Sequence, residues 1–199
     1  KIMGLAAYGK PIFFDKIKCN LFINSEKKNY ELNLNYFNHH NLDFKYIAGE
    51  KLEIDQIYNS KLLDLFSSEL KTFDKDQFNK DFASSVQKVY EFYFKKILTK
   101  IYKKNYSKNL IFAGGCALNS SANKMITNDK KLFEKVYIPY APGDNGGALG
   151  AAFVISIKYN NEIINSETPF LGKKFSSQDT KLILESESYA KKITYSEFD

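Results

Sequence analysis

The clearest hydrophobic pattern in the chain is a periodic run over residues 76–105. Apolar residues recur there every three or four positions, the spacing that places side chains on one face of an α-helix. Asp74 or Asp76 can cap the first turn, because aspartate accepts hydrogen bonds from the free amides of a helix start. The sequence therefore predicts one long core helix with a buried stripe of Phe78, Phe82, Val86, Val89, Tyr93, Ile97 and Ile101.

Two shorter patterns precede this helix. Residues 17–23 and 30–37 are apolar runs separated by a polar cluster at 24–29, and the second run alternates apolar with polar residues. That alternation predicts a half-buried β-hairpin. Residues 54–70 instead carry apolar side chains at helical spacing, which predicts another helix.

Two strand–turn–helix units follow the long helix. The first consists of an apolar run at 110–113, a glycine pair and a small-residue segment at 117–126. The second consists of an apolar run at 136–139, a turn at 141–143 and an apolar segment at 144–158. Such consecutive units are typical of α/β layers with helices packed on a sheet. We expect both strands to join the hairpin in one mixed sheet, with the long helix covering one face. Beyond Pro169 the chain is polar, with one weak helix at 177–190.

Composition narrows the possible functions. The net charge of the 199-residue chain is +6, and all 29 basic residues are lysines spread evenly along it. The planar fork of arginine, which suits phosphates and base edges, is missing, so nucleic acid is not expected as a partner. No apolar run is long enough to span a membrane, and the first residues do not follow the order of a signal peptide. We therefore expect a cytoplasmic location and no membrane partner.

The chain opens on Lys1 without an initiator methionine, although a motif-like string begins at once, so it resembles a fragment. Its two cysteines have no neighbours at metal-ligand spacing, which argues against a disulfide framework and predicts Cys116 to be a small buried filler. His39 and His40 are adjacent and project in different directions. They are expected to be solvated or locally packed rather than catalytic.

The first candidate for chemistry is the string Gly114, Gly115, Cys116, Ala117, Leu118, Asn119. Glycines after a buried strand let the backbone approach a ligand, and free amides at the following helix start favour an anion, so the string can be a phosphate cradle. It can equally be a tight strand-to-helix turn without a ligand. Asn119 and Asn123 share one helix face and are either donors to a nucleotide or solvated.

The second candidate is Asp144, which follows the turn Pro142–Gly143. A carboxylate at the end of a strand beside a glycine turn is suited to a metal bound to phosphate. The alternative is that Asp144 is only the N-cap of the next helix. Close-set glycines at 146, 147 and 150 indicate tight packing against that helix, and their spacing alone does not decide between the two.

Five separated motifs, in order, resemble the O-carbamoyltransferases of the nodulation and antibiotic-tailoring family: residues 1–11, 81–87, 114–120, 142–150 and 169–172. The likeness covers about residues 1–172. It implies an α/β fold, the carboxyl half of an actin-like ATPase (ribonuclease-H-like) domain with a mixed sheet and flanking helices. Residues 173–199 would then be a linker toward a missing second domain.

The resemblance also implies an activity. The full enzyme would transfer a carbamoyl group from carbamoyl-adenylate, made from carbamoyl phosphate and ATP, to a hydroxyl of a sugar or natural product. Gly114, Gly115 and Asn119 would help to hold the nucleotide, and Asp144 would be one ligand of an iron-type divalent metal. The family's other ligands, in a His-x-x-x-His string upstream of Lys1, have no counterpart here, and the isolated chain is expected to be inactive and free of metal.

Two alternatives stay open at this point. One is a relative of the universal tRNA threonylcarbamoyl-transfer protein, which the even spread of lysines and the string at 1–11 disfavour. The other is a nucleotide-binding scaffold without catalysis. The general base, the acceptor and the oligomeric state are not given by the sequence.

Overall fold

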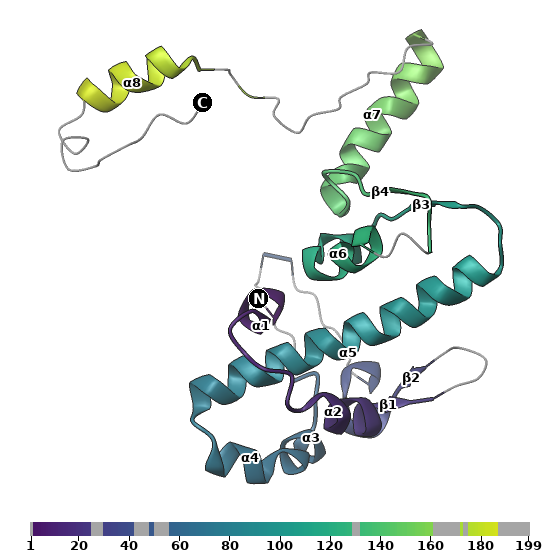
Figure 1. The fold of residues 1–199 in the computed structure, drawn as a ribbon, viewed down its shortest axis with the longest axis vertical. Coiled ribbons are helices and arrows are strands. Elements are labelled where there is room, and N and C mark those ends of the chain that lie inside the picture. Colours follow the sequence, from purple (N-terminus) through teal and green to yellow (C-terminus); the bar gives the residue numbers. More distant parts are fainter. Residues whose placement is uncertain are drawn as a thin grey trace. The chain divides into compact units, whose positions relative to one another are not determined.

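A computed structural model describes residues 2–24, 30–41, 48–49, 56–128, 132–160, 172 and 175–186. The chain divides into two compact units, Lys1–Gly146 and Gly147–Asp199, which we describe separately (Figure 1). The first unit is organised around the long helix α5 (Lys75–Lys103). The described residues are mostly helical with two small sheets, a mixed α/β arrangement.

Helix α5 confirms the strongest sequence pattern. Asp74 is its N-cap, and the side chain accepts hydrogen bonds of 3.0 Å from the amides of Asp76 and Gln77. The helix stops just before Asn105, whose φ of 53° lies in the left-handed region that asparagine tolerates better than most residues. Local chemistry therefore sets both ends of the helix.

One hydrophobic core forms between α5 and the elements that precede it. Helix α2 (Phe14–Leu21) leads into strand β1 (Phe22–Ile23), which pairs antiparallel with β2 (Glu31–Leu32). The hairpin is present, but most of its predicted first strand is α2. Phe13, Ile17 and Leu21 are spaced four residues apart, so the helix places them on the one face that is buried in the core with Val89 and Tyr93 of α5. After β2 come two 3₁₀ turns, η1 (Leu34–Tyr36) and η2 (His39–Asn41).

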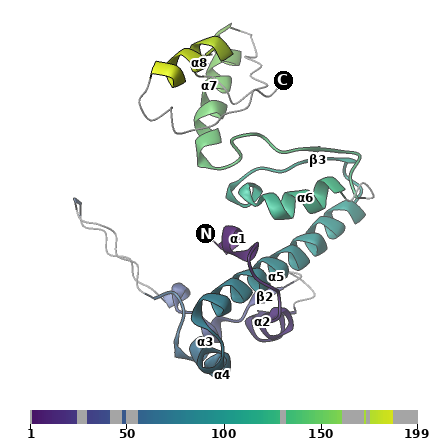
Figure 2. The same ribbon diagram turned by 60° about the vertical axis from the view of Figure 1, so that its left-hand side comes forward.

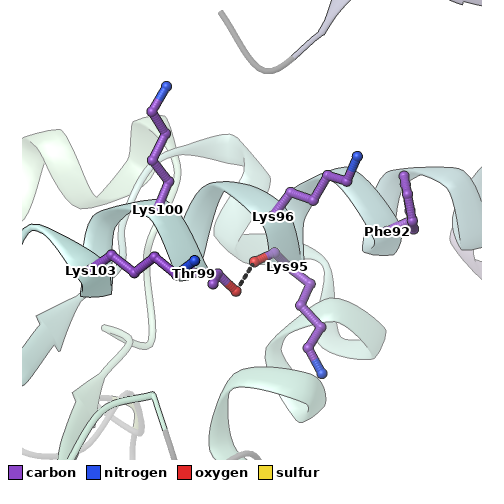
Figure 3. A pocket seen from close by; sticks show the side chains of 6 residues that line it. All are labelled: Phe92, Lys95, Lys96, Thr99, Lys100 and Lys103. Atoms are coloured by element: carbon purple, nitrogen blue, oxygen red, sulfur yellow. Dashed lines mark hydrogen bonds between the residues drawn. The ribbon is translucent and has the colours of Figure 1, made fainter. Parts of the chain in front are cut away.

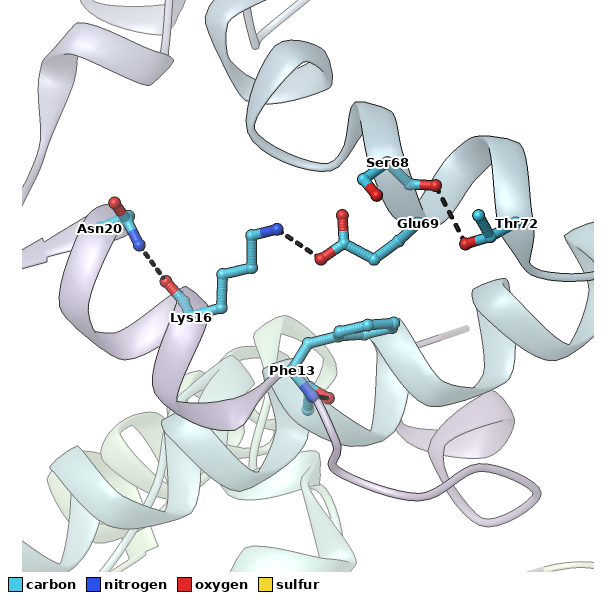
Figure 4. A network of polar contacts seen from close by, with 7 residues as sticks. Phe13, Lys16, Asn20, Ser68, Glu69 and Thr72 are labelled. Carbon is cyan, nitrogen blue, oxygen red and sulfur yellow. Dashed lines mark hydrogen bonds and ion pairs between the residues drawn. The ribbon is translucent and has the colours of Figure 1, made fainter.

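The helix predicted at 54–70 is two helices, α3 (Ser60–Leu65) and α4 (Ser67–Thr72), and residues 54–55 lie outside the described part. The break at Phe66 places its ring in the core, edge-on to Phe13 and Phe82. Figure 4 shows how α4 is held to α2, with Lys16 donating to the carboxylate of Glu69. The Lys16 ammonium also lies 5.0 Å from the centre of the Phe66 ring.

A second core lies on the other side of α5 (Figures 1 and 2). Strands β3 (Asn109–Ile111) and β4 (Lys135–Tyr137) pair in parallel, and between them come the 3₁₀ turn η3 (Gly115–Leu118) and helix α6 (Ser120–Asn128). Both strand–turn–helix units are confirmed. The expectation of one mixed sheet is wrong for the described residues, because α5 lies between the hairpin and the β3–β4 pair and each packs on its own face of the helix.

The second unit contains most of helix α7 (Asp144–Asn160) and helix α8 (Ser177–Ser186). Helix α7 confirms the predicted segment 144–158 and extends it by two residues. Helix α8 confirms the start of the weak helix at 177–190, whose last four residues lie outside the described part, as does most of the motif at 169–172. Within the residues that the structure describes, none of the helices has the length and apolar character needed to cross a membrane.

Candidate functional site

The segment at the start of the chain docks directly on α5. It contains the short helix α1 (Ile2–Ala6) and a turn at Gly9, where a side chain would collide with the backbone carbonyl of Lys80. The amide of Lys10 donates to Asp81 Oδ1 over 2.7 Å, and the amide of Phe13 donates to Ser85 Oγ over 3.0 Å. The motifs at 1–11 and 81–87 therefore fold as one structural piece.

Asp81 has a structural role in this piece. Only 4% of its surface is exposed, and the same carboxylate oxygen that accepts from Lys10 also accepts from Gln77 Nε2 over 2.9 Å. Two donors compensate a buried carboxylate for the water it has lost. Asp81 thus serves to fix the first segment on α5.

The loops that follow the two parallel strands meet at their carboxyl ends. The amide of Gly114 donates to the carbonyl of Pro142 over 2.7 Å, with Gly114 at a φ of +96° that disfavours any side chain. In the second loop, a Cβ on Gly143 would lie 3.4 Å from the side chain of Leu118. The predicted meeting of the Gly114 and Asp144 segments at one edge of the sheet is confirmed.

Asp144 is the first residue of α7 and is exposed. The amide of Gly146 donates to the carbonyl of Gly143 over 2.9 Å, which makes Gly143, and not Asp144, the residue just outside the helix. A carboxylate in the first helical turn interacts favourably with the helix dipole. The N-cap alternative is therefore replaced by a first-turn position, which leaves the side chain accessible from solvent.

Asn119 is held by a buried residue of α5. Its Nδ2 donates to Gln87 Oε1 over 3.0 Å, and Gln87 Nε2 donates back to Asn119 Oδ1 over 3.1 Å. The same oxygen accepts from the amide of Ala122 over 3.2 Å and so caps α6. Asn119 is consequently not simply solvated. Asn123 also holds the loop, donating through Nδ2 to the carbonyl of Ala117 over 2.7 Å.

A second contact joins α5 to the glycine loop. Burial, followed by the neighbouring Cys116 thiol, raises the pKa of the Tyr90 phenol to about 12. The ring of Tyr90 also stacks on Phe94 in the core. The prediction that Cys116 is a buried filler is wrong, because the residue is exposed where the loop turns over α5.

A pocket of about 200 Å³ lies where the first segment, α5 and the start of α6 come together. The side facing the first segment is apolar, and the side formed by α5 and α6 is polar. Six of its lining residues are Met3, Ala7, Ser84, Gln87, Glu91 and Ser121. Ser120, the residue after Asn119, donates through Oγ to the Met3 sulfur over 3.7 Å, so the pocket adjoins the glycine loop.

A larger groove of about 570 Å³ runs along α5, and the described residues that line it are six from this helix, including four lysines. Figure 3 shows that Lys96 and Lys100 point to one side of the helix and Lys95 to the other. The ammonium groups therefore do not converge on one point, as they would in an anion site.

The structure brings Gly114, Gly115 and Asn119 together with the loop that carries Asp144. It does not bring a metal-binding set together: among the described residues, no three His, Cys, Asp or Glu side chains gather closely enough to hold an ion. His39 and His40 lie in η2, where their rings contact each other and Phe37, in agreement with local packing.

Sequence reasoning missed the roles of Gln87 and Glu91. A signal was available, because Asp81, Ser85 and Gln87 are polar residues within the segment of α5 that carries the apolar stripe. Polar side chains on the buried face of a core helix must find partners, which marks them as contacts to other elements.

Comparison with known proteins places these features in context. The family model described as Carbamoyltransferase N-terminus matches residues 1–153. An uncharacterised protein of Synechocystis sp. is 31% identical over 192 residues, and one of Methanocaldococcus jannaschii is 27% identical over 200 residues. They match 92% and 98% of this chain, which spans only 29% of each of those proteins. Nodulation protein U of Sinorhizobium fredii is 44% identical over 46 residues, 23% of this chain and 8% of that protein.

Proposed function

Because residues 1–153 match the model of the carbamoyltransferase N-terminus, the chain belongs to the carbamoyltransferase family, and we propose that it is the part of an O-carbamoyltransferase that holds the activated carbamoyl donor. In this proposal the donor is carbamoyl-adenylate, made from carbamoyl phosphate and ATP, and the acceptor is a hydroxyl of a sugar or natural product. The two parallel strands and their loops would belong to an actin-like domain, completed by residues beyond those described.

The observation that carries the proposal is the contact between the two strand-end loops, Gly114 N to Pro142 O at 2.7 Å. Ligands of α/β proteins bind beyond the carboxyl ends of parallel strands, where adjacent loops approach each other. Gly114 and Gly115 present backbone there without Cβ atoms, so a phosphate could approach the loop closely. The Gly114 amide is already bonded to Pro142, so the amides that follow it in the loop would contact the phosphate. Asn119 would act mainly by fixing the loop, with the second hydrogen of Nδ2 as a donor to the nucleotide.

The transfer itself requires little covalent chemistry from the protein. The acceptor oxygen would bond to the carbamoyl carbon and lose its proton, while the bond from that carbon to the phosphate oxygen breaks and AMP leaves with the electron pair. The contribution of the loops would be to orient the donor and to stabilise the negative charge that develops on it.

The proposed metal site involves Asp144. Asp144 offers one accessible carboxylate, and the described residues do not complete a site around it. A transition metal usually needs four to six ligands. We propose Asp144 as a single ligand whose partners would lie outside the described part of the chain.

The likeness to a nodulation protein supports O-carbamoyl transfer over tRNA threonylcarbamoylation or a non-catalytic scaffold. The test is calorimetric titration of ADP into the complete protein that contains this chain. Gly114→Val should abolish measurable binding, because the positive φ strains any branched residue. Gly49→Val, at another glycine with a positive φ of 89° and outside the strand-end loops, is the matched control and should bind like the unaltered protein. Equal binding by all three proteins would remove the nucleotide role from this loop.

A further inference from the structure

The polar side of the 200 Å³ pocket is a connected hydrogen-bond network. Gln87 Nε2 donates both to Glu91 Oε1, over 3.0 Å, and to Asn119 Oδ1, over 3.1 Å. One side-chain amide therefore fixes a carboxylate in the pocket and the residue that shapes the glycine loop. A ligand that contacts Glu91 would therefore be linked through Gln87 to the loop of the proposed donor site.

The lining matches a small molecule with several hydroxyls. Glu91 is 16% exposed at its side chain, and its Oε2 lies 3.8 Å from Lys88 Nζ, so an acceptor and a donor stand side by side. Ser84 and Ser121 add hydroxyls, which donate and accept. Met3 and Ala7 form an apolar wall opposite, suited to the C–H face of a sugar ring. Carboxylate, amide and hydroxyl groups can together bind both the hydrogen-bond donors and the hydrogen-bond acceptors of a polyol.

The volume of the pocket suits a ligand smaller than a nucleotide. Pockets for drug-sized ligands have volumes of about 300–1,000 Å³, and this one is smaller. Its volume corresponds to roughly seven water molecules at about 30 Å³ each, which is enough for a single sugar-sized ring.

We propose that this pocket binds the hydroxyl-bearing acceptor, as a single sugar or similar polyol ring whose hydroxyl donates to Glu91. The proposal rests on the proposed carbamoyl transfer and adds the location of its second substrate. Gln87 is a positioning residue, because its side-chain amide holds the Glu91 carboxylate in place relative to the glycine loop that would bind the carbamoyl donor. The first eleven residues then have a functional reason to dock on α5, since they close the apolar side of the pocket.

The test uses saturation-transfer NMR on the complete protein with a panel of common hexoses, N-acetylhexosamines and inositol as probes. At least one probe should give a signal. Two substitutions should each weaken the binding of that probe by about tenfold or more. Ala7→Leu fills the pocket from an exposed position, and Glu91→Gln keeps the hydrogen bond from Gln87 but removes the charge. Ala152→Leu, exposed on α7, is the matched control and should leave binding unchanged.

Titration of ADP separates this inference from the proposed function. Ala7→Leu should bind ADP as the unaltered protein does, because the loop is untouched. Absence of a signal with every probe, or signals that survive both pocket substitutions, would overturn the acceptor site while leaving the nucleotide site standing. Loss of ADP binding in Gly114→Val alongside normal probe binding would support two separate sites, and absence of ADP binding in the unaltered protein would instead sink the carbamoyl-transfer proposal.

Discussion

Asn119 depends on a partner 32 residues earlier in the chain. A side-chain amide pair of this kind satisfies two donors and two acceptors at once, and buried Gln87 supplies one donor and one acceptor. The cap on α6 and the shape of the glycine loop are therefore tied to α5. Removing either amide leaves a polar group of the other without its partner.

Gln87→Leu should lower the free energy of unfolding by about 1–3 kcal/mol, because Asn119 and Glu91 both lose a hydrogen bond. Chemical denaturation of this variant measures the change. Gln178→Leu, on the exposed surface of α8, is the control and should stay within about 0.5 kcal/mol. Equal stabilities for the two variants would show that the amide pair contributes nothing measurable.

Asn119→Ala removes the cap and the loop support together. The free energy of unfolding should fall by about 1 kcal/mol, and ADP should bind more weakly to the complete protein, because an unsupported loop must be ordered on binding. Denaturation and calorimetry give the two values. Unchanged affinity with lowered stability would make Asn119 purely structural.

Tyr90 gives a prediction about alkaline pH. Its pKa is raised from 10.0 to about 12, so the fold favours the neutral phenol. This contribution to stability is fully present below the ordinary pKa and is lost as the pH rises through about 12. Burial also raises the pKa of Tyr93, so ultraviolet difference titration should find more than one tyrosine that ionises late, and Tyr90→Phe should reduce the amplitude of the late step. A late step of unchanged amplitude in the variant would assign the shift to another tyrosine.

At the scale of elements, Gly9 decides how the first segment meets α5. A Cβ there would collide with the Lys80 carbonyl, so Gly9→Ala must push the segment away from the helix. We expect a loss of about 1–3 kcal/mol in the free energy of unfolding. Gly4→Ala, with open space around it, is the matched control and should cost nothing comparable. Similar stability in both variants would mean that the segment docks loosely.

The contact between α2 and α4 predicts an acid response. The hydrogen bond from Lys16 lowers the pKa of Glu69 below its ordinary 4.5, so the contribution of this pair is present above that value and lost as the pH falls through the lowered pKa. The melting temperatures of the protein and of Glu69→Gln should therefore converge in acid. Asp15→Asn, whose carboxylate pairs with Lys18 but is 82% exposed, should show little difference at any pH.

How far the sequence predicts the elements depends on the length of the pattern. Helix α5 repeats its apolar spacing over many turns, so its bounds are correct almost to the residue. The run at 17–23 is too short to distinguish a strand from a helix, because Ile17 and Leu21 would share one face in either element. Phe66 itself follows the helical spacing, so the pattern does not predict that the helix is interrupted there. The interruption is explained by the aromatic cluster that the Phe66 ring joins. The meeting of the Gly114 and Asp144 loops follows from parallel strands, whereas the pairing of Gln87 with Asn119 is a long-range contact that periodicity does not encode.

At the scale of the whole molecule, the described residues supply the proposed donor loop and acceptor pocket, and Asp144 follows the loop that contacts the donor loop at Gly114. In the complete protein, Asp144→Ala should lose bound metal and reduce carbamoyl transfer by orders of magnitude, because one charged ligand is removed from the dication. Stability should change by only about 1 kcal/mol or less, since a first-turn carboxylate contributes little. Elemental analysis and a transfer assay give the result. Retained metal together with retained activity would reduce Asp144 to a helix-dipole residue.

Helix α5 also restricts how this protein can change in evolution. Tyr93 belongs to the core shared with α2, and its neighbour Phe94 belongs to the core shared with α6. Inserting one residue into α5 would rotate the part of the helix after the insertion by about 100° relative to the part before it. The side chains on one side of the insertion would then face away from their partners, so that Gln87 would lose Asn119 or Leu98 would leave the core that it shares with Ile126. Inserting four residues would nearly restore the faces but shift them by about 6 Å along the axis. Substitutions within α5 can be repaired one contact at a time, whereas a change in its length must be matched in both halves of the fold at once.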